Sequence, residues 1–149
     1  MGFLAGFEAI LYYKVGGVAG GGSWLPINIV RDATTPMSAD EIDVTTRGIA
    51  AGGFKAQEPL LKSGEVNFDI IWDPTDAAFT ALMNAFLGRL VIGIATRDQL
   101  GASGQGIEAD MKVFNLEKGE PLNDAQTASV TVKTCFSATL AAWTTGVLA

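Results

Sequence analysis

The sequence predicts an α+β domain that is mainly antiparallel β: a two-sheet β-sandwich or barrel with one flanking α-helix and a long central loop. Several short segments alternate apolar and polar residues, which is typical of half-buried antiparallel strands. One further segment, residues 79–87, repeats apolar residues at helical spacing. The chain has 149 residues, 48% of them hydrophobic, which predicts a single domain over residues 1–149 with a sizeable core.

The N-terminal part of the chain predicts two strands joined by a flexible turn. Every second residue of 7–15 is apolar, which indicates a strand. Residues 16–22 are rich in glycine but lack the lysine and the following helix of a phosphate-binding loop, so a hairpin turn is favoured. Residues 24–31 predict a second strand, which Pro26 confines to an edge or to a strand start.

Residues 33–62 differ from the rest of the chain because they show no firm periodicity. They contain prolines, glycines and only scattered apolar residues. A structureless stretch of this length is uncommon inside a compact domain unless it is functional or orders on binding. We therefore expect a long loop that is mobile in the free subunit.

A strand and the helix follow. Residues 65–72 alternate as a half-buried strand. Asp73 is expected to be the N-cap, with Pro74 at the first helical position and Asp76 near the positive end of the helix dipole. The apolar stripe then runs to residue 87, and Gly88 is expected to end the helix in the left-handed conformation.

Three more strands complete the expected sheet. They span residues 90–97, 107–116 and 129–136, separated by turns rich in glycine and proline. The tail from residue 137 is rich in alanine and threonine, with Trp143 as its one large anchor. The expected total is about six strands and one helix.

Composition excludes most catalytic chemistry. The chain has no histidine, which removes imidazole acid–base schemes, His-activated nucleophiles and His-ligated metal sites. Its single cysteine, Cys135, cannot form an internal disulfide or a cysteine-rich zinc site. The net charge of −6 argues against binding to the nucleic-acid backbone. We expect no catalytic residue, no cofactor and no metal.

Two groups of acidic residues are candidate sites. Asp40, Glu41 and Asp43 lack the spacing of a calcium loop, so a solvated or subunit-facing acidic cluster is favoured. A pair of glycosidase carboxylates could be drawn from Asp69, Asp73 and Asp76, but helix capping and the polar face of a strand already explain Asp73 and Asp69.

The hydropathy of the chain points to assembly. The mean hydropathy of +0.29 is high for a soluble monomer and suggests apolar surface reserved for partner subunits, although glycine and alanine alone could also raise it. No basic leader precedes the first apolar residues, and no apolar run is long enough for a membrane-spanning helix, so neither a signal peptide nor a membrane partner is expected.

A set of short phrases, taken in order along the chain, resembles a known family. They are YY (12–13), IVRD (29–32), EIDVTTR (41–47), GGFK (52–55), IWDPTD (71–76), EPLNDA (120–125) and SVTVK (129–133). Together they resemble the major tail tube proteins of long, non-contractile-tailed bacteriophages (siphovirus type) and related prophages. The resemblance covers residues 12–136.

The resemblance implies a function and partners. In this family six subunits close a ring whose inner strands form one barrel, and rings stack into a hollow tube that conducts double-stranded DNA to the host. It implies a virion tail tube assembled in the host cytoplasm, with tail terminator, tape measure and tail tip proteins as partners. Two alternatives stay open: the tube of a gene-transfer particle or type VI secretion system, and an unrelated β-sandwich binding or carbohydrate-active domain.

The resemblance concentrates in the central stretch, which suggests a role there. Because a spacer needs no specific phrase, we expect residues 33–62 to form the contact between stacked rings. Ile42 and Phe54 would be apolar anchors, and Glu41, Asp43 and Arg47 would be charged members of the same ring-stacking interface.

Overall fold

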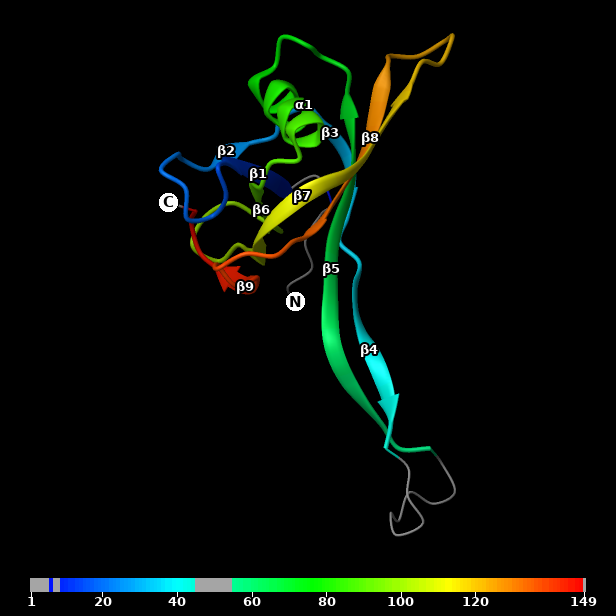
Figure 1. Ribbon diagram of the computed structural model, residues 1–149. Helices are drawn as coiled ribbons and strands as arrows, with labels where there is room; N and C mark the ends of the chain where they lie inside the picture. Colours follow the sequence, from blue (N-terminus) through cyan, green and yellow to red (C-terminus); the bar gives the residue numbers. More distant parts are fainter. Residues whose placement is uncertain (1–5, 7–8, 45–54, 149) are drawn as a thin grey trace.

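The computed structural model describes residues 6, 9–44 and 55–148, and within these ranges it contains nine β-strands and one α-helix (Figure 1). The elements are β1 (Ile10–Val15), β2 (Leu25–Pro26), β3 (Val30–Thr34), β4 (Met37–Asp43), β5 (Gln57–Ile71), α1 (Ala77–Gly88), β6 (Ile92–Arg97), β7 (Gln105–Gly119), β8 (Thr127–Thr134) and β9 (Ala142–Thr145). The strand pairs are antiparallel. This confirms the prediction of a mainly antiparallel β fold with one helix.

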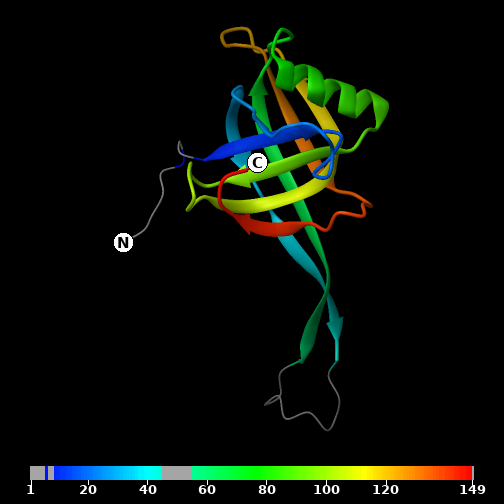
Figure 2. The same ribbon diagram turned by 90° about the vertical axis from the view of Figure 1, so that its left-hand side faces the viewer.

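Hydrogen bonding joins the described strands into one sheet, where the sequence predicted two. The order is β2-β1-β6-β7-β8-β5-β3, with β4 paired to β5 and β9 paired to β7. The first half of β7 pairs with β6 and β9, and the second half pairs with β8. A bulge between Val113 and Asn115 lets β7 bend between the two parts. The two sets of strands therefore cross each other in Figure 2 while sharing β7.

The core lies between the two parts of this curled sheet and under α1. Strand residues with alternate spacing supply most of it, which is why period-two patterns predicted the strands. The largest fully buried side chains are Val66, Ile70, Leu82, Ile92, Ile94, Met111, Val130 and Val132. Trp72 packs edge-on against Phe79 with ring centroids 4.7 Å apart, which fixes the helix against the end of β5.

Both expected caps of the helix are displaced. Asp76, not Asp73, is the N-cap, and its carboxylate accepts from the backbone N–H groups of Ala78 and Phe79. Asp73 instead accepts from the N–H and hydroxyl of Thr75, in a turn that delays the start of the helix. At the other end Arg89, not Gly88, takes the left-handed conformation, with φ of 54°.

The stretch expected to be a loop, residues 33–62, contains β4 and the first part of β5. These two strands pair from Met37 with Gly64 to Asp43 with Gln57, and the register shifts by one residue between Ala39 and Glu41. They form an extended two-stranded arm that leaves the body of the molecule (Figure 1). Both faces of the arm are exposed, so its strands do not alternate apolar and polar residues. The sequence pattern therefore could not identify them as strands. The mobility of this stretch stays a prediction.

Candidate functional site

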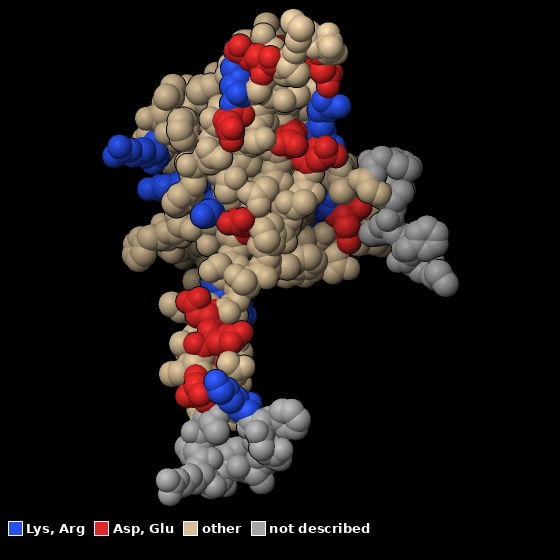
Figure 3. All heavy atoms as spheres, turned by 90° about the vertical axis from the view of Figure 1, so that its right-hand side faces the viewer, with Lys and Arg blue, Asp and Glu red and all other residues tan. Residues whose placement is uncertain are grey.

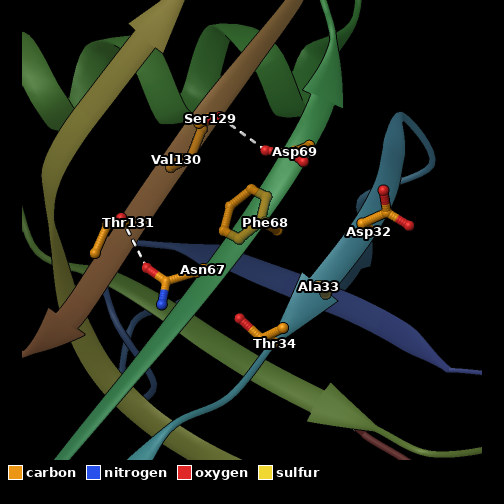
Figure 4. Close-up of a pocket in the computed structure, with 9 residues that line it drawn as sticks. All are labelled: Asp32, Ala33, Thr34, Asn67, Phe68, Asp69, Ser129, Val130 and Thr131. Carbon is orange, nitrogen blue, oxygen red and sulfur yellow. Dashed lines mark hydrogen bonds between the residues drawn. The ribbon is translucent and has the colours of Figure 1, made fainter.

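One candidate surface is the polar face of β3, β5, β8 and the second half of β7. Residues that pair across these strands point to the same face. Asp32 lies opposite Asp69, which lies opposite Ser129, which in turn lies opposite Glu117. The next row holds Thr34, Asn67, Thr131 and Asn115. We call this surface the acidic face, and Figure 4 shows its centre.

Hydrogen bonds between neighbouring strands hold the side chains of the acidic face in place. The hydroxyl of Ser129 donates to Asp69 Oδ1 at 2.8 Å, and the hydroxyl of Thr131 donates to Asn67 Oδ1 at 2.8 Å. A shallow cleft of about 230 Å³ lies among these residues and those of β3. Figure 4 shows the side chains that line this cleft. The surface is thus ordered and hydrophilic, without an enclosed pocket.

Charge on this side of the sheet is uneven. Asp32, Asp69 and Glu117 lie at one end of the face, and Lys112 and Lys133 lie opposite each other at the other end. Lys133 Nζ lies 3.8 Å from Glu65 Oε2, and this ion pair reduces the positive potential of the lysine. Figure 3 shows carboxylates over this side of the body and along the arm, with Lys and Arg side chains interspersed among them. The row that holds Asp32, Asp69 and Glu117 therefore carries three carboxylates and no lysine or arginine.

Two open backbone edges flank the acidic face. Within the described residues β3 pairs with β5 and leaves its other edge open. On β7, β6 covers residues 108–111, so the edge of residues 112–119 that faces away from β8 is also open. An open edge displays unpaired N–H and C=O groups and is a template for another strand. Neither edge was anticipated from the sequence, because edge position depends on topology.

The second candidate surface is the arm, defined here as residues 37–43 and 57–64. Every residue of β4 is exposed, and so are the first seven residues of β5. The exposed side chains include large apolar ones, Met37, Ile42, Leu60 and Leu61, of which Leu61 is 79% exposed. Such apolar side chains on a projecting hairpin indicate a surface that another molecule covers.

The arm brings together three of the five residues predicted to stack rings. Glu41, Ile42 and Asp43 are consecutive on β4, opposite Pro59, Glu58 and Gln57 on β5. The carboxylate of Glu41 accepts from Gln57 Nε2 at 3.2 Å. Arg47 and Phe54, the other two, lie outside the described residues. The role of all five in stacking stays a prediction.

The residues considered for catalysis and metal binding lie in different parts of the described structure: on β4, on β5, at the start of α1 and after β8. Within the described ranges no three potential ligands among His, Cys, Asp and Glu cluster as a metal site. Burial raises the pKa of the Cys135 thiol, which lies against the backbone carbonyl of Asp110. A thiol with a raised pKa is a poor nucleophile.

None of the helices in the described residues is long and apolar enough to cross a membrane.

No family model and no curated protein matches the chain, but solved structures do. The SPP1 tail tube superposes with a TM-score of 0.76 at 11% identity, over 98% of this chain and 81% of that one. The tail of an empty gene transfer agent (GTA) particle gives 0.73 at 14% identity, over 94% of this chain and 98% of that one. The chain has the tail tube fold. This confirms, at the level of the fold, the resemblance seen in the sequence.

The tail tube fold extends to contractile machines. A sheath-tube complex of an extracellular contractile injection system superposes with a TM-score of 0.63 at 12% identity, over 95% of this chain and 91% of that one. Coverage of nearly the whole chain in all three comparisons means that few residues of this chain lie outside the shared fold. A similar fold thus occurs in the structures of a phage tail tube, a gene transfer agent tail and a contractile injection system.

Proposed function

We propose that the chain is the structural subunit of a tail tube of a siphovirus-type phage or prophage. Six copies close a ring, and rings stack into a hollow conduit for double-stranded DNA. The tail tube fold supports this, and the GTA tail with the same fold was described with C6 symmetry. Tail terminator, tape measure and tail tip proteins would be the other partners in the virion.

The observation that carries the proposal is that two open edges flank the acidic face. If β3 of one copy pairs with residues 112–119 of the next, each copy contributes β3, β5, β8 and half of β7 to a continuous barrel. Closure into a ring removes both open edges, which otherwise promote aggregation. The acidic faces then all point the same way around the barrel.

A lumen lined by the acidic face suits the passage of DNA. Duplex DNA carries one negative charge per roughly 1.7 Å of its length, so a basic wall would bind it and slow it. Asp32, Asp69 and Glu117 repel it, and the hydroxyl and amide groups between them keep the wall hydrated. DNA would therefore pass without specific binding.

The arm supplies the contact between rings in this proposal. A two-stranded hairpin alone is at best marginally stable in water, so an exposed arm gains order when a neighbour covers it. Ile42 provides an apolar contact, and Glu41 and Asp43 provide charges that a neighbour's cations can pair with. Arg47 and Phe54 belong to the same proposed contact through their place in the sequence.

A second candidate is the tail tube of a gene transfer agent. The superposition on the GTA tail, with 98% of that chain covered, favours it as the alternative. Sequencing the DNA that is packaged in particles carrying this chain would distinguish the two candidates.

Electron microscopy of the purified protein tests the proposal. We expect six-fold rings and hollow tubes at high concentration, with an initiator complex added if concentration alone is not enough. Charge reversal of Asp32 and Asp69 to lysine is expected to leave tube formation intact and to make tubes retain duplex DNA in low salt. A protein that stays monomeric at millimolar concentration, in particles without tubes, contradicts the proposal.

A further inference from the structure

The C-terminal segment, residues 136–148, forms an uncharged apolar surface. It contains no charged residue, although 17% of the chain is charged. Its large apolar side chains point outward: Leu140 is 83% exposed and Phe136 is fully exposed, and Trp143 and Val147 are more than half exposed. Exposed apolar side chains concentrated in one short segment mark a surface that binds another protein.

Buried polar groups, rather than its own apolar side chains, hold this segment against the body. The buried carboxylate of Asp110 accepts from the Ser137 hydroxyl and, at 2.6 Å, from the backbone N–H of Val18. A side chain at Gly17 would collide with this carboxylate, since a Cβ there would lie 2.7 Å from Asp110 Oδ1. The segment is therefore anchored near its start to two other parts of the chain.

A second anchor lies near the end of the segment. The buried guanidinium of Arg97 donates to the Gly146 carbonyl at 3.0 Å and to the Thr144 hydroxyl at 2.8 Å. Between the anchors β9 pairs with β7, and its other edge is open within the described residues. The fold thus holds the segment near both of its ends. Leu140 stays 83% exposed and Trp143 56% exposed, and the indole N–H of Trp143 donates to Gln105 Oε1 at 2.9 Å.

An uncharged groove lies between α1, β1 and β6. Its volume is about 650 Å³, within the range of clefts that enclose a small ligand. Tyr13, Ala81 and Leu90 are among the residues that line it, and none of its described lining residues is charged. Asn84 and Thr80 of α1 lie at the same groove and are exposed.

The groove and the C-terminal surface lie at opposite ends of the body. In both ribbon views α1 lies at the end far from the arm, and β9 lies on the side from which the arm leaves (Figures 1 and 2). A contact between two different surfaces at opposite ends can repeat from head to tail, and such repetition produces a stack of copies.

We propose that Leu140 and Trp143 of one copy dock in the α1 groove of a second copy, as a stacking contact separate from the arm. The inference rests on the proposed tube. Because β9 and the arm lie toward the same end, one neighbouring ring can receive both. Leu140, Trp143 and the described lining of the groove are all uncharged, so these side chains would bury no unpaired charge on contact.

Leu140→Glu tests this contact. The side chain is exposed in the subunit, so the melting temperature is expected to stay unchanged while the carboxylate opposes burial in the groove. We expect normal rings and a critical concentration for tube formation raised at least about tenfold, which corresponds to about 1.4 kcal/mol per contact. Leu122→Glu is the matched control, since Leu122 is also highly exposed but lies in the β7–β8 turn.

A second substitution tests the partner surface. Asn84→Lys places a cation at the groove, so the double variant Leu140→Glu with Asn84→Lys is expected to recover most of the lost tubes. Normal tubes with Leu140→Glu, loss of rings as well as tubes, or no recovery in the double variant overturns the inference. These outcomes leave the proposed tube function standing, whereas that function fails if the unmodified chain forms neither rings nor tubes.

Discussion

Strand β5 runs through two regions of the molecule that differ in how they are stabilised. In the body, residues 64–71 alternate between buried and half-exposed, with Val66, Phe68 and Ile70 in the core. In the arm, residues 57–63 are all exposed. One strand therefore contains a part that the fold itself stabilises and a part that needs a neighbour. The exposed arm is therefore suited to a contact with another subunit, whereas the body half of β5 is part of the core of the domain.

The largest expected effect comes from truncating a core residue in the body half of β5. Phe68→Ala removes a buried aromatic side chain, which is expected to lower the free energy of unfolding by about 3–5 kcal/mol. The matched substitution in the arm half, Leu61→Ala, is expected to change it by less than about 0.5 kcal/mol. Denaturant unfolding of the free subunit measures both. Similar losses for the two variants would mean that the arm packs on the body in solution.

Reversing a charge in the arm is expected to affect assembly and not folding. Asp43→Lys should block the stacking of rings through like-charge repulsion and leave the melting temperature of the subunit nearly unchanged, because residue 43 is exposed. Sedimentation of tubes and a thermal melt measure the two effects. Asp32→Lys is the control, since it makes the same charge change on the exposed part of β3 in the body. Normal tubes from Asp43→Lys would remove the arm from the proposed stacking contact.

A smaller effect is expected from the helix cap, which belongs to the body alone. Asp76→Ala leaves the N–H groups of Ala78 and Phe79 without their acceptor and is expected to cost about 1 kcal/mol of stability. Asp73→Ala should cost less, since Asp73 bonds within a turn ahead of the helix. If Asp73→Ala proves the more damaging of the two in thermal melts, the assignment of the cap is wrong.

The last prediction is that the free subunit does not bind duplex DNA. With a net charge of −6 and carboxylates on both the acidic face and the arm, the free subunit should show no measurable affinity for duplex DNA at physiological salt. A gel shift measures this. A saturable shift at micromolar protein that weakens steeply with salt would contradict our account of the charge.

The sequence predicted the body better than the arm, for a physical reason. Alternation identified residues 65–71 and 129–134 because one face of each strand is buried, and apolar spacing identified α1 for the same reason. The arm has no buried face, so nothing in its pattern distinguished paired strands from a loop. The N-cap differs from the predicted one because two aspartates near the start of the helix, Asp73 and Asp76, offer competing acceptors.

Features that depend on long-range contacts were beyond sequence reasoning. The open edges of β3 and β7 follow from strand order, which the alternation of single strands does not encode. Nothing in the local sequence marks Asp110 or Arg97 as anchors, since their partners are 27 and 47 residues away along the chain. The single sheet follows from the bend at the bulge of β7, which shifts the alternation of that strand.

Amide hydrogen exchange of the arm tests the central claim most directly. The account predicts fast exchange in residues 37–43 and 57–63 of the free subunit, beside slow exchange in residues 64–71 of the same strand. In assembled tubes the arm should become strongly protected, because a neighbouring ring then covers it. Slow exchange in the arm before assembly, or fast exchange that persists in tubes, would contradict the claim that the arm is ordered by stacking.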